Sequence, residues 1–268
     1  MPGKLKMSNI KKQFEKFGFC IVRKAFSEQE CYEFKEKIID FFSDKNGNLI
    51  NNLNKNYRDG KEPTRPMAFN DDNFSFLYPI FQNQKLINTF NNLTNNSLMF
   101  LHHSDVHVDT VAGKGWHRDC INNSSGRNSV NWKDKFITKD YWDTSIDEKY
   151  NVIRAALYLQ DHSENNNGLH IIAGSHLLDN HYKEMYVPTN LGDIILFDAR
   201  LKHKGGPNVK KGNYRTAIFW AMGEDNVFSH EHKNASIARQ LYQRDEEEKN
   251  YNLNKNLKMV LNEGRIGY

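Results

Sequence analysis

The sequence carries three His-x-Asp triplets close together, at 103–105, 107–109 and 117–119. An imidazole and a carboxylate two positions apart on an extended segment point to the same side, so each pair could hold a metal ion. One triplet alone is weak evidence, because a His and an Asp on one strand face more often form a simple hydrogen-bonded pair. The first two triplets alternate along one predicted strand and are typical of a polar strand face.

The third triplet is placed differently. His117 and Asp119 follow the glycine-containing turn 112–115, and a pair at the lip of a strand can direct both groups at one point. Fe(II) in oxygen-activating enzymes is held by two imidazoles and one carboxylate on one face, which leaves positions for substrate and dioxygen. The second imidazole must come from elsewhere. His203 is a good candidate, because it follows the apolar strand 194–197 and precedes Gly205 and Gly206.

Arg215 opens the next predicted aromatic strand, 214–220. A guanidinium that points into a barrel needs a partner, because a buried unpaired charge is costly. Its two-pronged donor geometry would suit the planar carboxylate of a bound acid.

The elements that must position these residues are mostly strands. From residue 98 the pattern becomes short strands separated by glycine turns, typical of a sandwich or barrel. We predict strands over 98–108, 152–160, 169–173, 193–198 and 214–222. Before them we predict a strand over 18–22 and a helix that begins at Ser27, which forms a Ser-x-x-Glu capping box with Glu30.

Other segments are less regular. The stretch 44–73 is rich in Asn, Lys, Asp and Pro and has few apolar anchors, so we predict a long surface excursion there. A second long insertion is predicted between Cys120 and Tyr150. From Ala235 the tail is charged and helical in pattern.

Composition narrows the class of protein. The chain has 268 residues and a hydrophobic fraction of 38%, which is enough for a substantial core and fits a single domain over 1–268. The net charge of +4 is small and spread out, which argues against a nucleic-acid partner. The apolar runs are too short to cross a membrane, and three distant cysteines favour a reducing compartment. We therefore expect a cytoplasmic protein, monomeric or homodimeric.

Several segments together resemble the phytanoyl-CoA dioxygenase-like family: Trp116–Asp119, Gly168–His176, Gly192–Phe197, His203 and Arg215. The strand and helix over 18–42 also look like the N-terminal segment of that family, so the resemblance covers most of the chain. It implies a mainly β fold with flanking helices, built on a double-stranded β-helix of the jelly-roll or cupin-like type. It also implies Fe(II), 2-oxoglutarate as cosubstrate and O2. His117, Asp119 and His203 would then be the iron ligands, and Arg215 would hold the distal carboxylate of 2-oxoglutarate.

The implied reaction is oxidation of an unactivated C–H bond in a small molecule, most simply hydroxylation with release of succinate and CO2. Asp119 favours hydroxylation, desaturation or ring formation, because a related halogenase needs a small residue in place of that carboxylate. Two alternatives stay open: a non-catalytic β-helix binding protein, and a zinc-type metallohydrolase that uses the same ligand set. The first would not need the four site residues, and the second gives no reason for Arg215.

The candidate substrate-binding residues are Arg154, Tyr158 and Trp132. Arg154 shares a strand face with Tyr158 and could reach into the barrel, with a solvated outward arginine as the alternative. Trp132 lies in the second insertion, and the alternative to substrate binding is that its ring packs in the core or within the loop. The basic residues Arg127, Lys133 and Lys135 would suit an anionic substrate, but no residue selects a particular compound.

Overall fold

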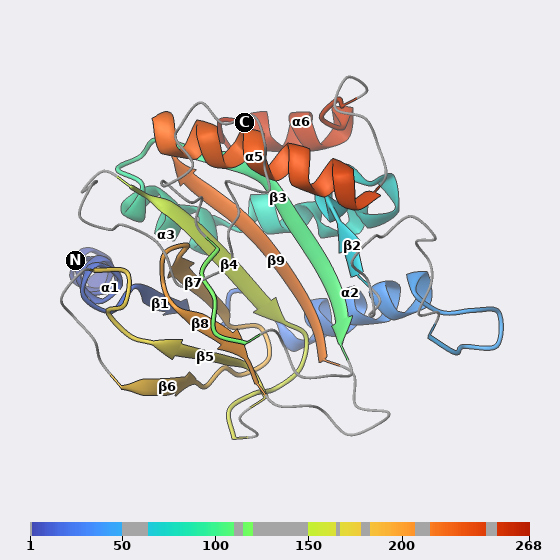
Figure 1. The fold of residues 1–268 in the computed structure, drawn as a ribbon, viewed down its shortest axis with the longest axis horizontal. Coiled ribbons are helices and arrows are strands. Elements are labelled where there is room, and N and C mark those ends of the chain that lie inside the picture. Colours follow the sequence, from blue (N-terminus) through green and yellow to red (C-terminus); the bar gives the residue numbers. More distant parts are fainter. Residues whose placement is uncertain are drawn as a thin grey trace.

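The computed structural model describes residues 2–49, 64–109, 115–119, 150–164, 167–177, 183–206, 215–244 and 251–268. Its centre consists of two antiparallel sheets that face each other, with helices around them (Figure 1). This arrangement confirms the predicted fold class, a mainly β core of double-stranded β-helix type with flanking helices. None of the helices in these ranges is long and apolar enough to cross a membrane.

The larger sheet has six strands in the order β1-β7-β4-β9-β3-β2. Their bounds are Phe19–Val22 (β1), Ile194–Asp198 (β7), Val152–Tyr158 (β4), Arg215–Glu224 (β9), Leu98–Asp109 (β3) and Thr64–Pro66 (β2). The smaller sheet has the order β6-β5-β8, with bounds Glu184–Val187, Leu169–Ile172 and His203–Gly205.

The larger sheet is covered on both faces, and every residue of β4 and β7 is buried. The inner face meets the smaller sheet through one apolar cluster, which includes Ala156, Tyr158, Ile195, Phe197 and Ala217. The outer face packs against helices through a larger apolar cluster. The helices that contribute to this cluster are α1 (Pro2–Phe17), α2 (Glu28–Phe41), η2 (Asp72–Gln82), α3 (Gln84–Leu93) and α6 (Lys255–Glu263).

The predicted strands and the predicted helix start are confirmed. The strands predicted over 18–22, 98–108, 152–160, 169–173, 193–198 and 214–222 appear as β1, β3, β4, β5, β7 and β9. The side chain of Ser27 accepts a hydrogen bond from the Glu30 N–H, and the Glu30 carboxylate accepts one from the Ser27 N–H. Both halves of the capping box are therefore present.

Two predictions were wrong in part. In the predicted surface excursion 44–73, residues 64–73 contain β2, the short helix η1 (Ala68–Asn70) and the start of η2. Met67, Ala68 and Phe69 are fully buried, because these few apolar residues pack into the core beside β3. The helix predicted from Ala235 begins earlier, since α5 spans Val227–Arg244.

A bulge in β3 sets which of its side chains face inward. The pairing of β3 with β9 shifts register between Phe100 and Ser104, and His102 there has a left-handed backbone with φ 52°. Gln240 of α5 completes the hydrogen bonding of this bulge. Its Oε1 accepts from the Ser104 N–H at 3.2 Å, and its Nε2 donates to the His102 carbonyl at 2.8 Å. Beyond the bulge Asp105 lies opposite Phe219, on the inner face of the sheet.

Candidate metal centre

The backbone brings His117 and His203 side by side although they are far apart in sequence. The two residues form an isolated antiparallel bridge, with N–H to O=C hydrogen bonds of 3.0 and 2.9 Å in the two directions. The Asp119 N–H donates to the Ala199 carbonyl at 2.8 Å. The short segment 115–119 is therefore held along β8 and the turn that precedes it.

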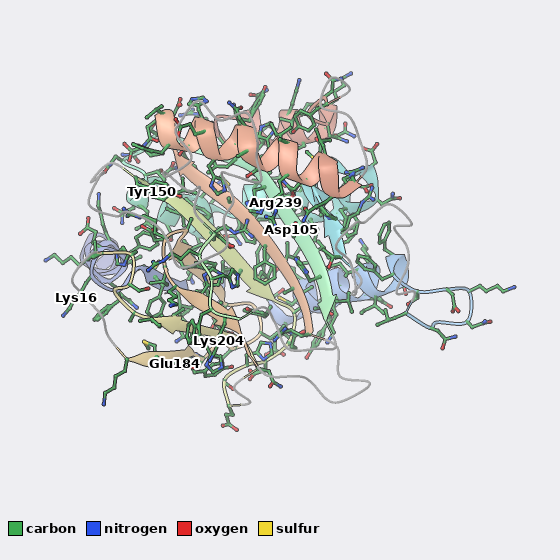
Figure 2. The ribbon with its side chains drawn as sticks, viewed as in Figure 1. Lys16, Asp105, Tyr150, Glu184, Lys204 and Arg239 are labelled. Atoms are coloured by element: carbon green, nitrogen blue, oxygen red, sulfur yellow. The ribbon has the colours of Figure 1, made fainter. Side chains whose placement is uncertain are left out.

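Side chains reinforce this attachment. The Lys204 ammonium lies 4.4 Å from the centre of the Trp116 ring and 2.9 Å from a Glu184 carboxylate oxygen. Figure 2 shows Lys204 and Glu184 next to each other on the smaller sheet. This links the neighbours of both histidines, Trp116 and Lys204, across the bridge.

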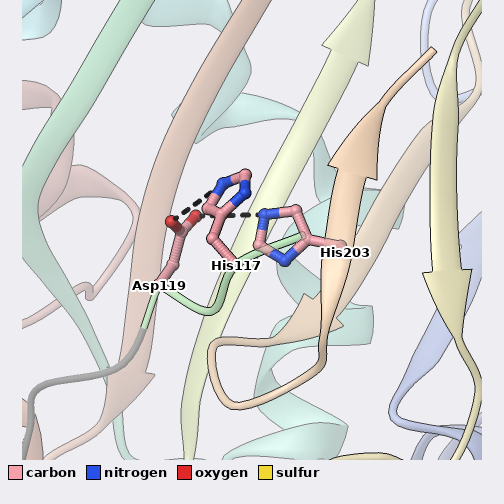
Figure 3. Close-up of side chains that lie close together, drawn as sticks. All are labelled: His117, Asp119 and His203. Carbon is pink, nitrogen blue, oxygen red and sulfur yellow. Dashed lines mark ion pairs between the residues drawn. The ribbon is translucent and has the colours of Figure 1, made fainter. Parts of the chain in front are cut away.

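Three potential ligand atoms converge at this point, as Figure 3 shows. One atom each from His117, Asp119 and His203 lies within 4.8 Å of the other two. The His117 Nε2 is 3.8 Å from Asp119 Oδ1, and the His203 Nε2 is 3.7 Å from Asp119 Oδ2. In the described part of the chain, this is the one such group of three.

In both histidines, a hydrogen bond from Nδ1 to a backbone carbonyl leaves Nε2 as the nitrogen that can bind a metal. The Nδ1 of His117 lies 2.8 Å from the Gly115 carbonyl, and that of His203 lies 2.9 Å from the Leu201 carbonyl. A carbonyl only accepts, so each Nδ1 carries a proton, and in the neutral form of each ring Nε2 is the nitrogen that offers a lone pair. Burial, with His117 as the next cause, lowers the pKa of His203 to about 4, so this ring is neutral at pH 7. Neutral imidazoles are the form that binds metals.

The Asp119 carboxylate is also suited to bind a cation. Burial alone would raise the pKa of Asp119, but the Arg154 guanidinium, followed by the two imidazoles, holds that pKa well below its usual range. Two imidazole Nε2 atoms and one ionised carboxylate on one side fit an Fe(II) ion that keeps open positions.

The other predicted site residues lie on the inner face or outside the described ranges. Arg215 is buried and donates through Nη1 to the carbonyls of Asn167, at 2.9 Å, and Gly206, at 3.4 Å. It therefore reaches from the larger sheet to the chain next to the smaller one. Tyr158 is buried opposite Ala217, with its ring edge-on to those of Phe219 and His162. Trp132 lies outside the described residues.

Arg154 is only 4% exposed, so the alternative of a solvated outward arginine is wrong. Its Nε lies 3.1 Å from Asp119 Oδ2, and its Nη2 lies 3.6 Å from Asp105 Oδ2. It is thus a direct neighbour of the candidate metal ligand Asp119, and two of its nitrogens face carboxylates of the protein itself.

A buried polar chain behind Arg154 was not assigned to the site from the sequence. Asp105 lies on β3 near α5 (Figure 2), and its Oδ2 is 3.3 Å from His103 Nε2. The other ring nitrogen of His103 is 3.2 Å from His232 Nε2 on α5. The first triplet had marked His103 and Asp105 as a polar strand face, and the structure turns that face inward. No spacing rule could have connected His232 to them.

Comparisons with known proteins identify the family of the chain. The family model for phytanoyl-CoA dioxygenase (PhyH) matches residues 14–217. No curated protein sequence matches the chain significantly.

Solved structures share the fold at low sequence identity. The 2-oxoglutarate-dependent epimerase SnoN from nogalamycin biosynthesis has 13% identity and a TM-score of 0.58, over 82% of this chain and 83% of SnoN. AviO1 from Streptomyces viridochromogenes Tue57 has 18% identity and a TM-score of 0.57, over 82% of this chain and 95% of AviO1. HygX from Streptomyces hygroscopicus, solved with nickel and 2-oxoglutarate, has 14% identity and a TM-score of 0.56, over 81% and 86% of the two chains. From the family match, the chain belongs to the phytanoyl-CoA dioxygenase family, whose cofactors are Fe(II), 2-oxoglutarate and O2.

Proposed function

We propose that this protein hydroxylates a small molecule in an Fe(II)- and 2-oxoglutarate-dependent reaction that releases succinate and CO2, and that the whole chain serves as one oxygenase domain. The observation that carries the proposal is the group formed by His117, Asp119 and His203. Its three ligand atoms lie within 4.8 Å of one another, and both Nδ1 atoms donate to carbonyls so that both Nε2 atoms are available.

Each residue has a separate role in this proposal. His117, Asp119 and His203 hold Fe(II), and Arg215 holds the distal carboxylate of 2-oxoglutarate through its two-pronged donor geometry. When held by these residues, Fe(II), 2-oxoglutarate and O2 would supply oxidising chemistry for a C–H bond of the substrate. The buried inner face around Tyr158 and Phe197 keeps water away and orients the substrate.

Hydroxylation is the finer part of the proposal. Among the similar structures, SnoN is described as an epimerase and SnoK as a carbocyclase, so the fold also serves other outcomes. Two findings about the chain favour an oxidation of this kind over zinc hydrolysis: its family membership, and Arg215, which a zinc hydrolase would not need.

The substrate is proposed as a small molecule that contacts Tyr158 from the inner face. SnoN and HygX have been solved with nogalamycin RO and hygromycin B, respectively, which supports a binding site for compounds of that general size. The contacts of Arg154 and Trp132 with the substrate, and its anionic character, remain predictions.

The first experiment is an anaerobic titration of the metal-free protein with Fe(II) and then 2-oxoglutarate. The wild type should develop the weak visible charge-transfer band of an iron chelate. His203→Ala should lose the band, and Arg215→Met should need far more 2-oxoglutarate to reach it. Arg23→Met is the matched control, because Arg23 is half-exposed and pairs with Asp193 at 2.7 Å. It should titrate like the wild type.

A wild type that binds iron but gives no band with 2-oxoglutarate would contradict the proposal and favour a hydrolytic metal site. Once the band is established, a substrate screen by succinate release identifies compounds for product analysis. A gain of one oxygen atom supports hydroxylation. A product that has lost two hydrogens would show ring formation or desaturation instead of hydroxylation. A product of unchanged mass would show epimerisation instead.

A further inference from the structure

Arg154 lies between two carboxylates of the protein. From β4 its Nε lies 3.1 Å from Asp119 Oδ2, in hydrogen-bonding distance, and its Nη2 lies 3.6 Å from Asp105 Oδ2. The third nitrogen, Nη1, is buried and makes no hydrogen bond to any residue that the structure describes. The guanidinium therefore has little freedom, and its firmest contact is with one oxygen of the candidate metal ligand.

The second carboxylate is fixed by the sheet. Asp105 pairs with Phe219, which pairs in turn with Ala156, so the Asp105 and Arg154 side chains project from the same inner face. His103 lies 3.3 Å from the Asp105 carboxylate and 3.2 Å from His232 of α5. Asp105 is thus tied both to the sheet and to the helix above it.

We propose that Arg154, supported by Asp105, is a positioning residue that holds Asp119 Oδ2 so that the carboxylate binds the metal through Oδ1 alone. A carboxylate with one oxygen held by an N–H donor presents the other as a single ligand atom. One-oxygen ligation uses one position of the metal and leaves the remaining ones for cosubstrate, O2 or water. The inference rests on the proposed function, because it requires that Asp119 be a metal ligand.

If Arg154 positions Asp119, removing it should weaken metal binding, but charge alone predicts the opposite. A guanidinium beside the metal ligand repels a divalent cation, so its removal would tighten metal binding if charge dominated. The Asp105 carboxylate next to the guanidinium offsets its positive charge, so the pair is close to neutral as seen by the metal. The orientation of Asp119 should therefore outweigh charge repulsion. Whether metal affinity falls or rises when Arg154 is replaced decides between the two effects.

The test uses Co(II), whose visible spectrum reports coordination, with the full-length metal-free protein. Arg154→Met should bind Co(II) about 10–100-fold more weakly than the wild type, the range typical for residues that orient a metal ligand, with an altered visible spectrum. Arg154→Lys, which keeps the charge without the fork, should also alter the spectrum. Arg23→Met is again the matched control and should change neither the affinity nor the spectrum.

A double-mutant cycle tests the support from Asp105. Asp105→Asn alone should weaken Co(II) binding, and its effect should be smaller in the Arg154→Met background, because Asp105 then has no guanidinium to hold. Equal effects in both backgrounds would overturn the role of Asp105.

Other outcomes separate this inference from the proposed function. If the wild type binds Co(II) and Arg154→Met binds it as tightly or more tightly with the same spectrum, the positioning role is refuted and the metal centre stands. If the wild type binds no Co(II), both fail. Thermal unfolding without metal checks that each variant is folded. Should Arg154→Met not fold, an unaltered Co(II) spectrum in Arg154→Lys refutes the positioning role.

Discussion

Replacing Gln240 by methionine should lower the free energy of unfolding by about 3 kcal/mol, although the two side chains are similar in volume. The Gln240 amide is fully buried and satisfies three backbone groups outside its own helix. Oε1 accepts from the N–H groups of Met67 at 2.9 Å and Ser104 at 3.2 Å, and Nε2 donates to the His102 carbonyl at 2.8 Å. Methionine can replace none of these, and each hydrogen bond lost to a buried backbone group costs about 1 kcal/mol or more.

Gln243→Met provides the matched control. Gln243 lies on the same helix and is also buried, but its Oε1 accepts no hydrogen bond from any residue in the described ranges. Urea unfolding of the metal-free protein should show a loss for Gln240→Met and almost none for Gln243→Met, since removing an unsatisfied polar group is nearly neutral. In a thermal scan the first variant should unfold about 6 °C lower or more, at about 2–4 °C per kcal/mol for a chain of this size. Equal small losses in both variants would refute the reasoning that Gln240 holds the bulge together.

Three further predictions concern stability. Burial lowers the pKa of His102 to about 3 and, with Arg154 as the next cause, that of His103 to about 4, so both bind fewer protons in the folded than in the unfolded state. Stability should therefore fall as pH drops from about 6.5 towards 4, and an unfolding midpoint that stays constant over that window contradicts this. Gly192→Ala should unfold at much lower urea than Gly47→Ala. Both glycines have positive φ, but a Cβ at Gly192 would overlap the Phe26 carbonyl oxygen, whereas a Cβ at Gly47 would meet no described residue within 4 Å. Similar midpoints for the two would show that the backbone yields at Gly192. Ser27→Ala should cost about 1 kcal/mol through loss of the capping box, and Ser27→Asp, which preserves a capping oxygen, should recover most of it.

The sequence predicted those strands that carry their own apolar signal. Strands β4 and β7 are buried on both faces, so their residues read as almost continuous apolar runs. The strands β2, β6 and β8 were not predicted. Strands β2 and β8 have only three residues each, and β6 is largely exposed, so none of the three shows an apolar pattern long enough to recognise.

The candidate site divides in a similar way. His117, Asp119, His203 and Arg215 were selected from spacing and from the resemblance. The first two follow a glycine-containing turn, His203 follows an apolar strand and Arg215 opens one. The residues around Arg154 could not be selected, since Asp105 and His103 come from an earlier strand and His232 from a late helix. Only the bulge in β3 and the packing of α5 bring them together, and neither leaves a local mark in the sequence.

Helix α5 explains why this part of the site escapes pattern analysis. Its buried residues include a polar row at helical spacing, made of Ser229, His232, Ser236, Gln240 and Gln243. A helix that packs on a sheet normally buries an apolar stripe, so the start of α5 was missed and only the part from Ala235 was predicted. The polar row has defined tasks, because Gln240 completes the β3 bulge and His232 contacts His103. The bulge in turn directs Asp105 towards Arg154, so this helix gives up apolar burial to fix the surroundings of the candidate metal ligand Asp119.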